Sequence, residues 1–161
     1  MKAWSGVLVT LVLAACAGTV GTPKLEPGKS TAQDVEKQMG KPALVLDQPT
    51  GGKIEYFTTF PFGRVTYAVS LGANGVVSKV EQRLTQNNVQ SIKVGMKKSE
   101  VLALLGPPRE QTRNAQTQRD VLEYPWMTGN GRKRITWVHV SGDGVVQEVV
   151  EREDFEAEPS E

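Results

Sequence analysis

The clearest hydrophobic pattern in the chain is a helical one at residues 101–105. Its four large apolar side chains fall at positions i, i+1, i+3 and i+4, which places one apolar stripe on a helix. Gly106 can adopt the left-handed conformation that ends a helix, and Pro107 and Pro108 cannot continue one. The pattern therefore predicts a helix that stops at Gly106.

A weaker copy of this pattern lies upstream. Ser30 or Thr31 can cap the earlier helix, whereas Lys97 stands at the cap position of the later one. Four pairs of landmarks recur at nearly one spacing, which indicates a tandem duplication with small loop insertions. The pairs are Gly28 and Gly95 (67 residues apart), Gly40 and Gly106 (66), Gly75 and Gly144 (69), and Tyr56 and Tyr124 (68).

Alternating apolar and polar residues predict three strands in each copy. They cover residues 54–59, 64–71 and 76–84, and then 121–126, 134–140 and 145–150. A short edge strand at 43–46 is also possible, and the polar stretch 110–118 is interpreted as a loop. We therefore predict an α+β fold of two tandem ααβββ repeats, residues 25–84 and 85–150, with helices packed on antiparallel sheet and one sheet face left for solvent or a partner.

The first 15 residues predict a removable signal segment. Lys2 supplies a positive start, residues 7–12 are apolar apart from Thr10, and Leu-Ala-Ala precedes Cys16. The arrangement resembles the lipobox of bacterial lipoprotein signal peptides, which implies cleavage before Cys16 and acylation of its thiol. The alternative is an ordinary signal peptide with an incidental cysteine.

Two further segments follow from composition. Residues 16–24 are small and turn-prone and predict a flexible tether, and residues 151–161 predict an acidic tail. Because Ala17 rather than aspartate follows the cysteine, the analogy with lipoprotein sorting implies an outer-membrane anchor facing the periplasm. Cys16 is the single cysteine, so an intrachain disulfide is excluded.

Charge and chemistry exclude several classes of function. Without Lys2, 18 basic residues balance 18 acidic ones, which gives no support for nucleic-acid binding. The only histidine, His139, alternates with Val138 and Val140 and is expected on a strand surface. No metal-ligand, phosphate-loop or dinucleotide motif is present. We therefore expect no catalytic residues, no cofactor and no bound metal.

Three aromatic residues stand near predicted turns: Phe60, Phe62 and Trp126. They are the candidate partner surface, because exposed aromatic side chains anchor many protein interfaces. The alternative is that they close the edge of the core.

Residues 87–108, together with the lipobox, resemble the SmpA/OmlA family, whose best-known member is the outer-membrane lipoprotein BamE. The first copy fits the family more loosely, and the typical member has one ααβββ unit where this chain has two. In the second copy the matching residues are 92–96, Glu100, Val101, Leu105, Gly106, Pro108, Tyr124, 137–140 and 144–145. In the first copy they are Gly28, Val35, residues 40–42, Tyr56, Asn74 and Gly75. The structural motif consists of Gly28, Gly40, Pro42, Gly95, Gly106 and Pro108.

The resemblance implies a non-catalytic outer-membrane lipoprotein that supports envelope integrity, with components of β-barrel outer-membrane protein assembly as partners. Tandem units of this kind also resemble the β-lactamase-inhibitory protein fold, in which paired repeats form a concave binding surface. The alternative function is therefore a periplasmic protein-binding or inhibitor module.

Overall fold

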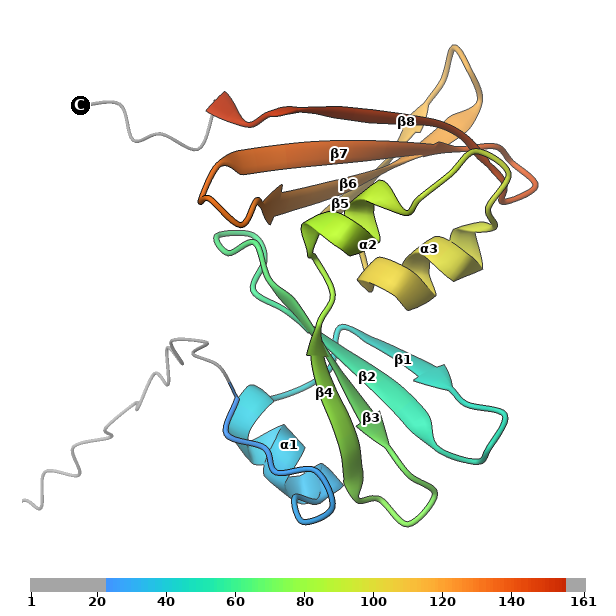
Figure 1. Ribbon diagram of the computed structural model, residues 1–161. Coiled ribbons are helices and arrows are strands. Elements are labelled where there is room, and N and C mark those ends of the chain that lie inside the picture. Colours follow the sequence, from blue (N-terminus) through green and yellow to red (C-terminus); the bar gives the residue numbers. More distant parts are fainter. Residues whose placement is uncertain (1–22, 156–161) are drawn as a thin grey trace, which may run out of the picture.

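The structure, a computed structural model, describes residues 23–155 (Figure 1). It is α+β, with two four-stranded antiparallel sheets in the orders β1-β2-β3-β4 and β5-β6-β7-β8. Cys16 and the predicted signal peptide lie outside the described residues. The elements are α1 (Ala32–Met39), β1 (Leu44–Asp47), β2 (Lys53–Thr58), β3 (Thr66–Leu71), β4 (Val77–Gln82), α2 (Gln86–Gln90), α3 (Lys98–Leu105), β5 (Glu110–Asn114), β6 (Arg119–Met127), β7 (Lys133–Val140) and β8 (Val146–Glu153).

The first unit, residues 23–84, packs α1 against the first sheet. Thr31 and Asp34 form a complete capping box at the start of α1, as the sequence predicts. The hydrogen bonds from Thr31 lower the pKa of the Asp34 carboxyl. The buried side chains of this core are Leu25, Val35, Phe57, Val69, Leu71 and Val77.

The second unit, residues 85–155, packs α2 and α3 against the inner face of the second sheet. Its buried core is larger than the first and includes Val101, Tyr124 and Trp126. The Tyr124 hydroxyl donates to Gly106 O (3.1 Å), and burial raises the pKa of this hydroxyl. The Trp126 indole donates to Thr136 Oγ1 (3.0 Å), so its one polar atom is satisfied inside the core.

Equivalent backbone hydrogen bonds occur within each unit at matching positions. The N–H of Gly28 donates to Val77 O (2.8 Å), and the N–H of Gly95 donates to Val146 O (2.9 Å). Both long helices end in a glycine whose N–H bonds four residues back, and both units have a register shift near the end of their third strand. Matching pairs are Gly40 to Glu36 O and Gly106 to Leu102 O, Thr59 to Val65 O and Thr128 to Arg132 O, and the bridges Thr31–Val76 and Lys97–Val145.

These bonds correct one predicted pair of landmarks. The N–H of Ala43 donates to Tyr56 O and that of Arg109 donates to Glu123 O, so Phe57 matches Tyr124. Phe57 and Tyr124 both belong to the core under their own helices, whereas Tyr56 faces the other side of its sheet.

Other predicted boundaries also differ. Among residues 23–155, the first unit has one helix and each unit has four strands, so the ααβββ order is wrong in detail. Residues 110–114 form strand β5 where a loop is predicted; its side chains are mostly exposed, and pairing with β6 defines it. β8 continues to Glu153, into the predicted acidic tail, and Lys24 of the predicted tether bonds Gln38.

The first sheet is packed on one face by α1 and over part of the other face by the second unit. The end of α3 lies over the face opposite α1, where the Tyr56 hydroxyl donates to Ala103 O (2.7 Å) and burial raises the pKa of that hydroxyl (Figure 1). Thr66 and Ala68 are buried on this face. The second unit therefore covers part of the face that the sequence left for solvent or a partner, around Tyr56, Thr66 and Ala68, while Lys79 on the same face stays exposed.

The β2–β3 loop also joins the two units. Phe60 packs against the core of the second unit. Arg64 donates to Arg134 O (3.1 Å) and pairs with Asp154, and the two charged side chains are only 11% and 10% exposed. The two units therefore form one packed body.

Candidate protein-binding face

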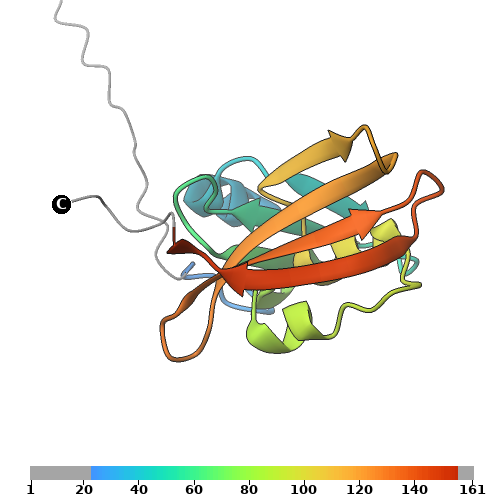
Figure 2. The ribbon, with the colours of Figure 1, turned by 90° about the horizontal axis from the view of Figure 1, so that it is seen from above.

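The second sheet has an outer face that no described helix covers. Figure 2 views the molecule from this side, with the four strands in front of the helices. Strand register sets the side chains of this face opposite one another, Val121 with His139, Glu123 with Trp137, and Trp137 with Val150. We call these five residues the outer face. All are partly buried by their neighbours in the sheet.

Trp137 lies at the middle of the outer face and is held in place. Its indole Nε1 donates to Glu123 Oε2 (3.0 Å). The other oxygen of Glu123 accepts from Arg109 Nε (2.6 Å). Because this chain of bonds fixes the indole before any partner arrives, little side-chain entropy remains to be lost on binding.

The composition of the outer face suits protein contact. Tryptophan is among the residue types most enriched in binding hot spots, and Val121 and Val150 add apolar surface to the same face as the indole. The indole N–H of Trp137 already donates to Glu123, so a partner can cover the indole without leaving this N–H unsatisfied.

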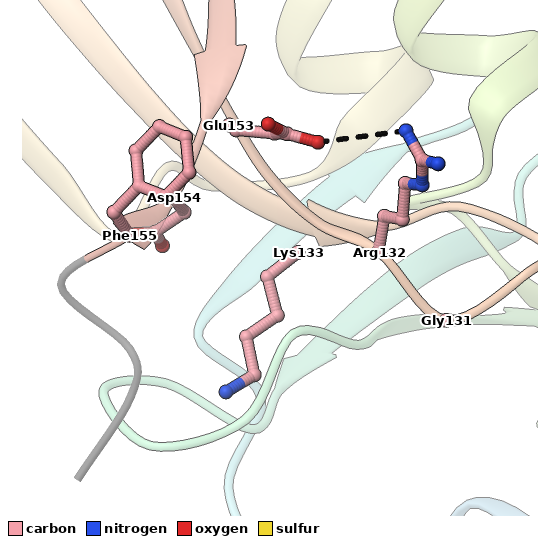
Figure 3. A pocket seen from close by; sticks show the side chains of 6 residues that line it. All are labelled: Gly131, Arg132, Lys133, Glu153, Asp154 and Phe155. Atoms are coloured by element: carbon pink, nitrogen blue, oxygen red, sulfur yellow. Dashed lines mark ion pairs between the residues drawn. The ribbon is translucent and has the colours of Figure 1, made fainter.

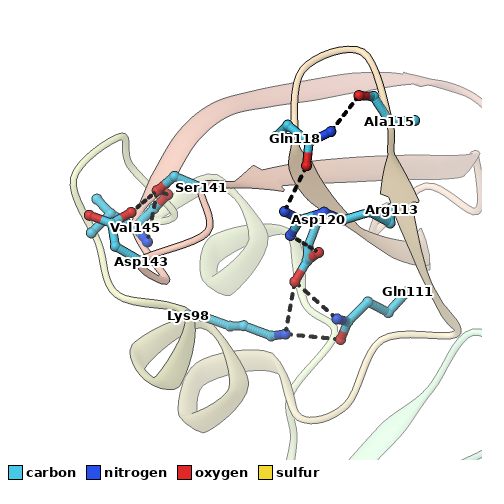
Figure 4. A network of polar contacts seen from close by, with 9 residues as sticks. All are labelled: Lys98, Gln111, Arg113, Ala115, Gln118, Asp120, Ser141, Asp143 and Val145. Carbon is cyan, nitrogen blue, oxygen red and sulfur yellow. Dashed lines mark hydrogen bonds and ion pairs between the residues drawn. The ribbon is translucent and has the colours of Figure 1, made fainter.

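On the inner side of the same sheet, a polar network braces the edge formed by the β5–β6 hairpin (Figure 4). Asp120, at the start of β6, accepts from Arg113 (2.9 Å) and Gln111 (3.2 Å) and lies 3.6 Å from Lys98 Nζ. The hydrogen bond from Arg113, followed by charge attraction from Arg113 and Lys98, lowers the pKa of the Asp120 carboxyl. The network ties the β5–β6 hairpin to the start of α3 and so holds the edge of the sheet.

The predicted partner surface does not exist as one patch. Phe62 is 97% exposed, but Trp126 is fully buried and Phe60 packs against the second core. The prediction that Trp126 is exposed is wrong, because closeness to a turn does not decide which face of a strand a side chain occupies. Its alternation with Leu122 and Tyr124 already places it on the inner face of β6.

The predicted structural residues lie where helices and turns end. Gly28, Gly40, Gly95 and Gly106 all have positive φ, at 80°, 76°, 93° and 82°. Side chains with a Cβ rarely adopt this conformation, which explains glycine at each position. Pro42 and Pro108 stand in the links from α1 to β1 and from α3 to β5.

Trp137 is not among the candidate partner residues predicted from the sequence. In β7 the apolar residues Ile135 and Trp137 alternate with Val138 and Val140, so both faces of the strand look hydrophobic and the pattern does not mark the free one. His139 shares the outer face with Trp137, as its alternation with Val138 predicts.

The pocket beside α2 is a weaker candidate for a binding site than the outer face. It has a volume of about 400 Å³ and is lined by Arg134 and Glu151. Arg134 donates to Glu151 through both Nε (3.0 Å) and Nη2 (2.6 Å), which occupies its guanidinium. Within residues 23–155, no three His, Cys, Asp or Glu side chains are grouped to hold a metal, and no helix is long and apolar enough to cross a bilayer.

No protein-family model and no curated protein matches this chain. Among solved structures, the DUF4309-family protein YjgB of Bacillus subtilis is similar, at 18% identity over 81% of this chain and 83% of its own, with a TM-score of 0.32. A "putative beta-lactamase inhibitor protein" of Streptococcus mutans is similar at 11% identity over 76% and 82%, also with a TM-score of 0.32. Likenesses this distant carry no functional argument, and the SmpA/OmlA resemblance stays a prediction.

Proposed function

We propose that this protein is a lipid-anchored, non-catalytic protein-binding module on the periplasmic face of the bacterial outer membrane. The observation that carries the proposal is the outer face, a sheet surface that no described helix covers, with Trp137 held by Glu123 and Arg109. Anchoring rests on the lipobox-like sequence that ends at Cys16.

The proposed scaffold is a tandem duplication of one helix-and-sheet unit. The shared hydrogen bonds of Gly28 and Gly95, and of Gly40 and Gly106, support this origin. By the SmpA/OmlA resemblance, the proposed partners are components of β-barrel outer-membrane protein assembly, and the role is support of envelope integrity.

The size of the outer face indicates the kind of complex. A sheet of four strands, five to nine residues long, presents about 500 Å² on one face. Stable complexes bury about 800 Å² on each partner, and weaker encounters bury less. We therefore propose a small, reversible contact centred on Trp137.

Photo-crosslinking in intact cells tests this proposal. A benzoylphenylalanine side chain at position 137 should yield an adduct with an outer-membrane assembly component, identified by mass spectrometry. The same probe at Ala73, in the β3–β4 turn, is the control and should yield none. Loss of a hot-spot tryptophan costs about 2 kcal/mol or more, so Trp137→Ala should weaken the complex about 30-fold.

Other outcomes separate the alternatives. An adduct with one soluble periplasmic enzyme, together with its inhibition, would favour the inhibitor module. A folded Trp137→Ala variant that binds its partner with unchanged affinity would overturn the outer face as the site. The anchor has its own test, because Cys16→Ala should release the protein from the membrane fraction.

A further inference from the structure

One end of the molecule presents two phenylalanine side chains to solvent. Phe62, in the β2–β3 loop, is 97% exposed, and Phe155, just after β8, is 77% exposed. Arg64 pairs with Asp154, which brings the two chain segments together. We call Phe62 and Phe155 the aromatic tip.

The loop that presents Phe62 is firmly held. The N–H of Thr59 donates to Val65 O (3.0 Å), and Thr59 Oγ1 accepts from Val65 N–H (3.0 Å). The N–H of Gly63 donates back to Thr59 O (2.8 Å), and a Cβ at Gly63 would lie only 2.0 Å from Thr59 Oγ1. These hydrogen bonds hold the loop in one conformation, and that conformation leaves Phe62 exposed.

Phe155 stands at the border of a pocket of about 260 Å³ (Figure 3). Arg132, just before β7, and Lys133, the first residue of β7, line the same pocket together with Glu153 and Asp154. Arg132 lies 3.7 Å from Glu153, and Arg64 pairs with Asp154. The exposed phenylalanine, and not an excess of basic charge, is therefore the feature that suits a lipid surface.

The aromatic tip lies on the side where the described chain begins. Figures 1 and 2 both show the first described residues, the β2–β3 loop and the end of β8 on the same side of the molecule. Cys16 and Pro23 are seven positions apart, and a chain of this length spans at most about 25 Å when fully extended. A lipid on Cys16 therefore holds this side close to the bilayer.

We propose that the aromatic tip rests in the headgroup region of the membrane that holds the anchor, so that the molecule has a fixed orientation. Phenylalanine has no hydrogen-bond donor or acceptor and gains by leaving water for this region. The short tether raises the local concentration of the tip at the bilayer, so weak insertion suffices. This inference rests on the proposed anchoring through Cys16.

Fluorescence quenching tests the orientation in the full-length, lipidated protein. Because Cys16 is the only cysteine and is acylated under the proposal, Phe62→Cys and Phe155→Cys each offer one free thiol for an environment-sensitive dye. The protein is reconstituted in vesicles of phosphatidylethanolamine and phosphatidylglycerol with doxyl-labelled lipid. Ala73→Cys is the control, since the β3–β4 turn lies at the opposite end of β3 from the β2–β3 loop.

Dyes at positions 62 and 155 should be quenched by shallow doxyl groups, at about 5–10 Å depth, and the dye at 73 should not. Phe62→Ser should reduce the quenching at position 155. Equal quenching at 62, 155 and 73 on vesicle-bound protein would overturn the orientation while leaving the anchor intact. Protein that stays off the vesicles whether or not Cys16 is present would overturn the anchor and the inference together.

Discussion

Gly40 and Gly106 end equivalent helices with nearly the same backbone, φ 76° and 82°. Their surroundings differ. A Cβ at Gly40 would meet no atom within 4 Å, whereas a Cβ at Gly106 would lie 2.8 Å from both Thr66 Cγ2 and Tyr56 Cδ1. Both positions need glycine for the backbone conformation. Gly106, unlike Gly40, also needs it because the two units approach each other closely there.

This difference predicts unequal effects of one substitution. Gly40→Ala should destabilise the protein by about 1–3 kcal/mol, from backbone strain alone. Gly106→Ala should cost about 1–3 kcal/mol more, because the added methyl group forces α3 away from the first sheet. Denaturant unfolding of both variants measures the difference, and equal losses would contradict the close packing at Gly106.

Residue identity also shows where pattern reading succeeds. The positive φ of Gly28, Gly40, Gly95 and Gly106 was predictable, because helix ends and turns are local features. The burial of Trp126 was predictable from its alternation with Tyr124, although closeness to a turn was given more weight. Of the three candidates for an exposed anchor, Phe62 alone is largely exposed, at 97%.

At the scale of the element, the two long helices differ in their first turn. Thr31 caps α1 with its side chain. The side chain of Lys97, at the matching position of α3, cannot accept a hydrogen bond. At this helix start only the reverse bond forms, in which the Lys97 N–H donates to Glu100 Oε2 (2.7 Å). The absence of a side-chain cap at α3, expected from the sequence, is therefore confirmed.

Restoring the missing cap should stabilise the protein. Lys97→Thr should raise the free energy of unfolding by about 0.5–1 kcal/mol, because its hydroxyl can accept from the Glu100 N–H. Lys97→Ala is the control for removing a positive charge near a helix start. Thr31→Ala should show the reverse effect, a loss of about 1 kcal/mol. Thermal unfolding of the three variants checks the order, and a Thr variant no more stable than the Ala variant would contradict it.

Strand β5 shows the limit of pattern reading for an element. Its sequence, Glu-Gln-Thr-Arg-Asn, contains no apolar residue and has no alternation to detect. It is a strand because its backbone pairs with β6 from Glu110 to Asn114 and because Arg113 and Gln111 bind Asp120. The pairing backbone and Asp120 belong to β6, so the sequence of β5 alone does not predict that β5 is a strand.

For the whole molecule, the contact that decides the arrangement is the ion pair of Arg64 and Asp154. The two residues are 90 positions apart, and their side chains are nearly buried. Arg64 also donates to Arg134 O, so one guanidinium holds the β2–β3 loop to both β7 and the end of β8. A buried charge that loses its partner is costly, which makes the pair a sensitive probe of the junction.

Arg64→Ala and Asp154→Ala should each destabilise the protein by about 3 kcal/mol, because each leaves one charge buried without its partner. The double variant should lose less than the sum of the two, since neither charge is then left unpaired. Denaturant unfolding of all four proteins gives this coupling energy. Additive losses would show that the two side chains do not interact in solution.

The sequence by itself determined the local features of this protein: the glycines that end helices, the Thr31 cap, most of the strands and the near-constant spacing of the two units. These depend on backbone conformation and on periodicity within a few residues. Only the tertiary structure decided that α3 covers part of the first sheet, that Phe57 rather than Tyr56 matches Tyr124, and that Trp137 stands on the free face while Trp126 is buried. Each of these depends on which surfaces meet in the folded chain, and the pairing of distant surfaces is set by packing between units.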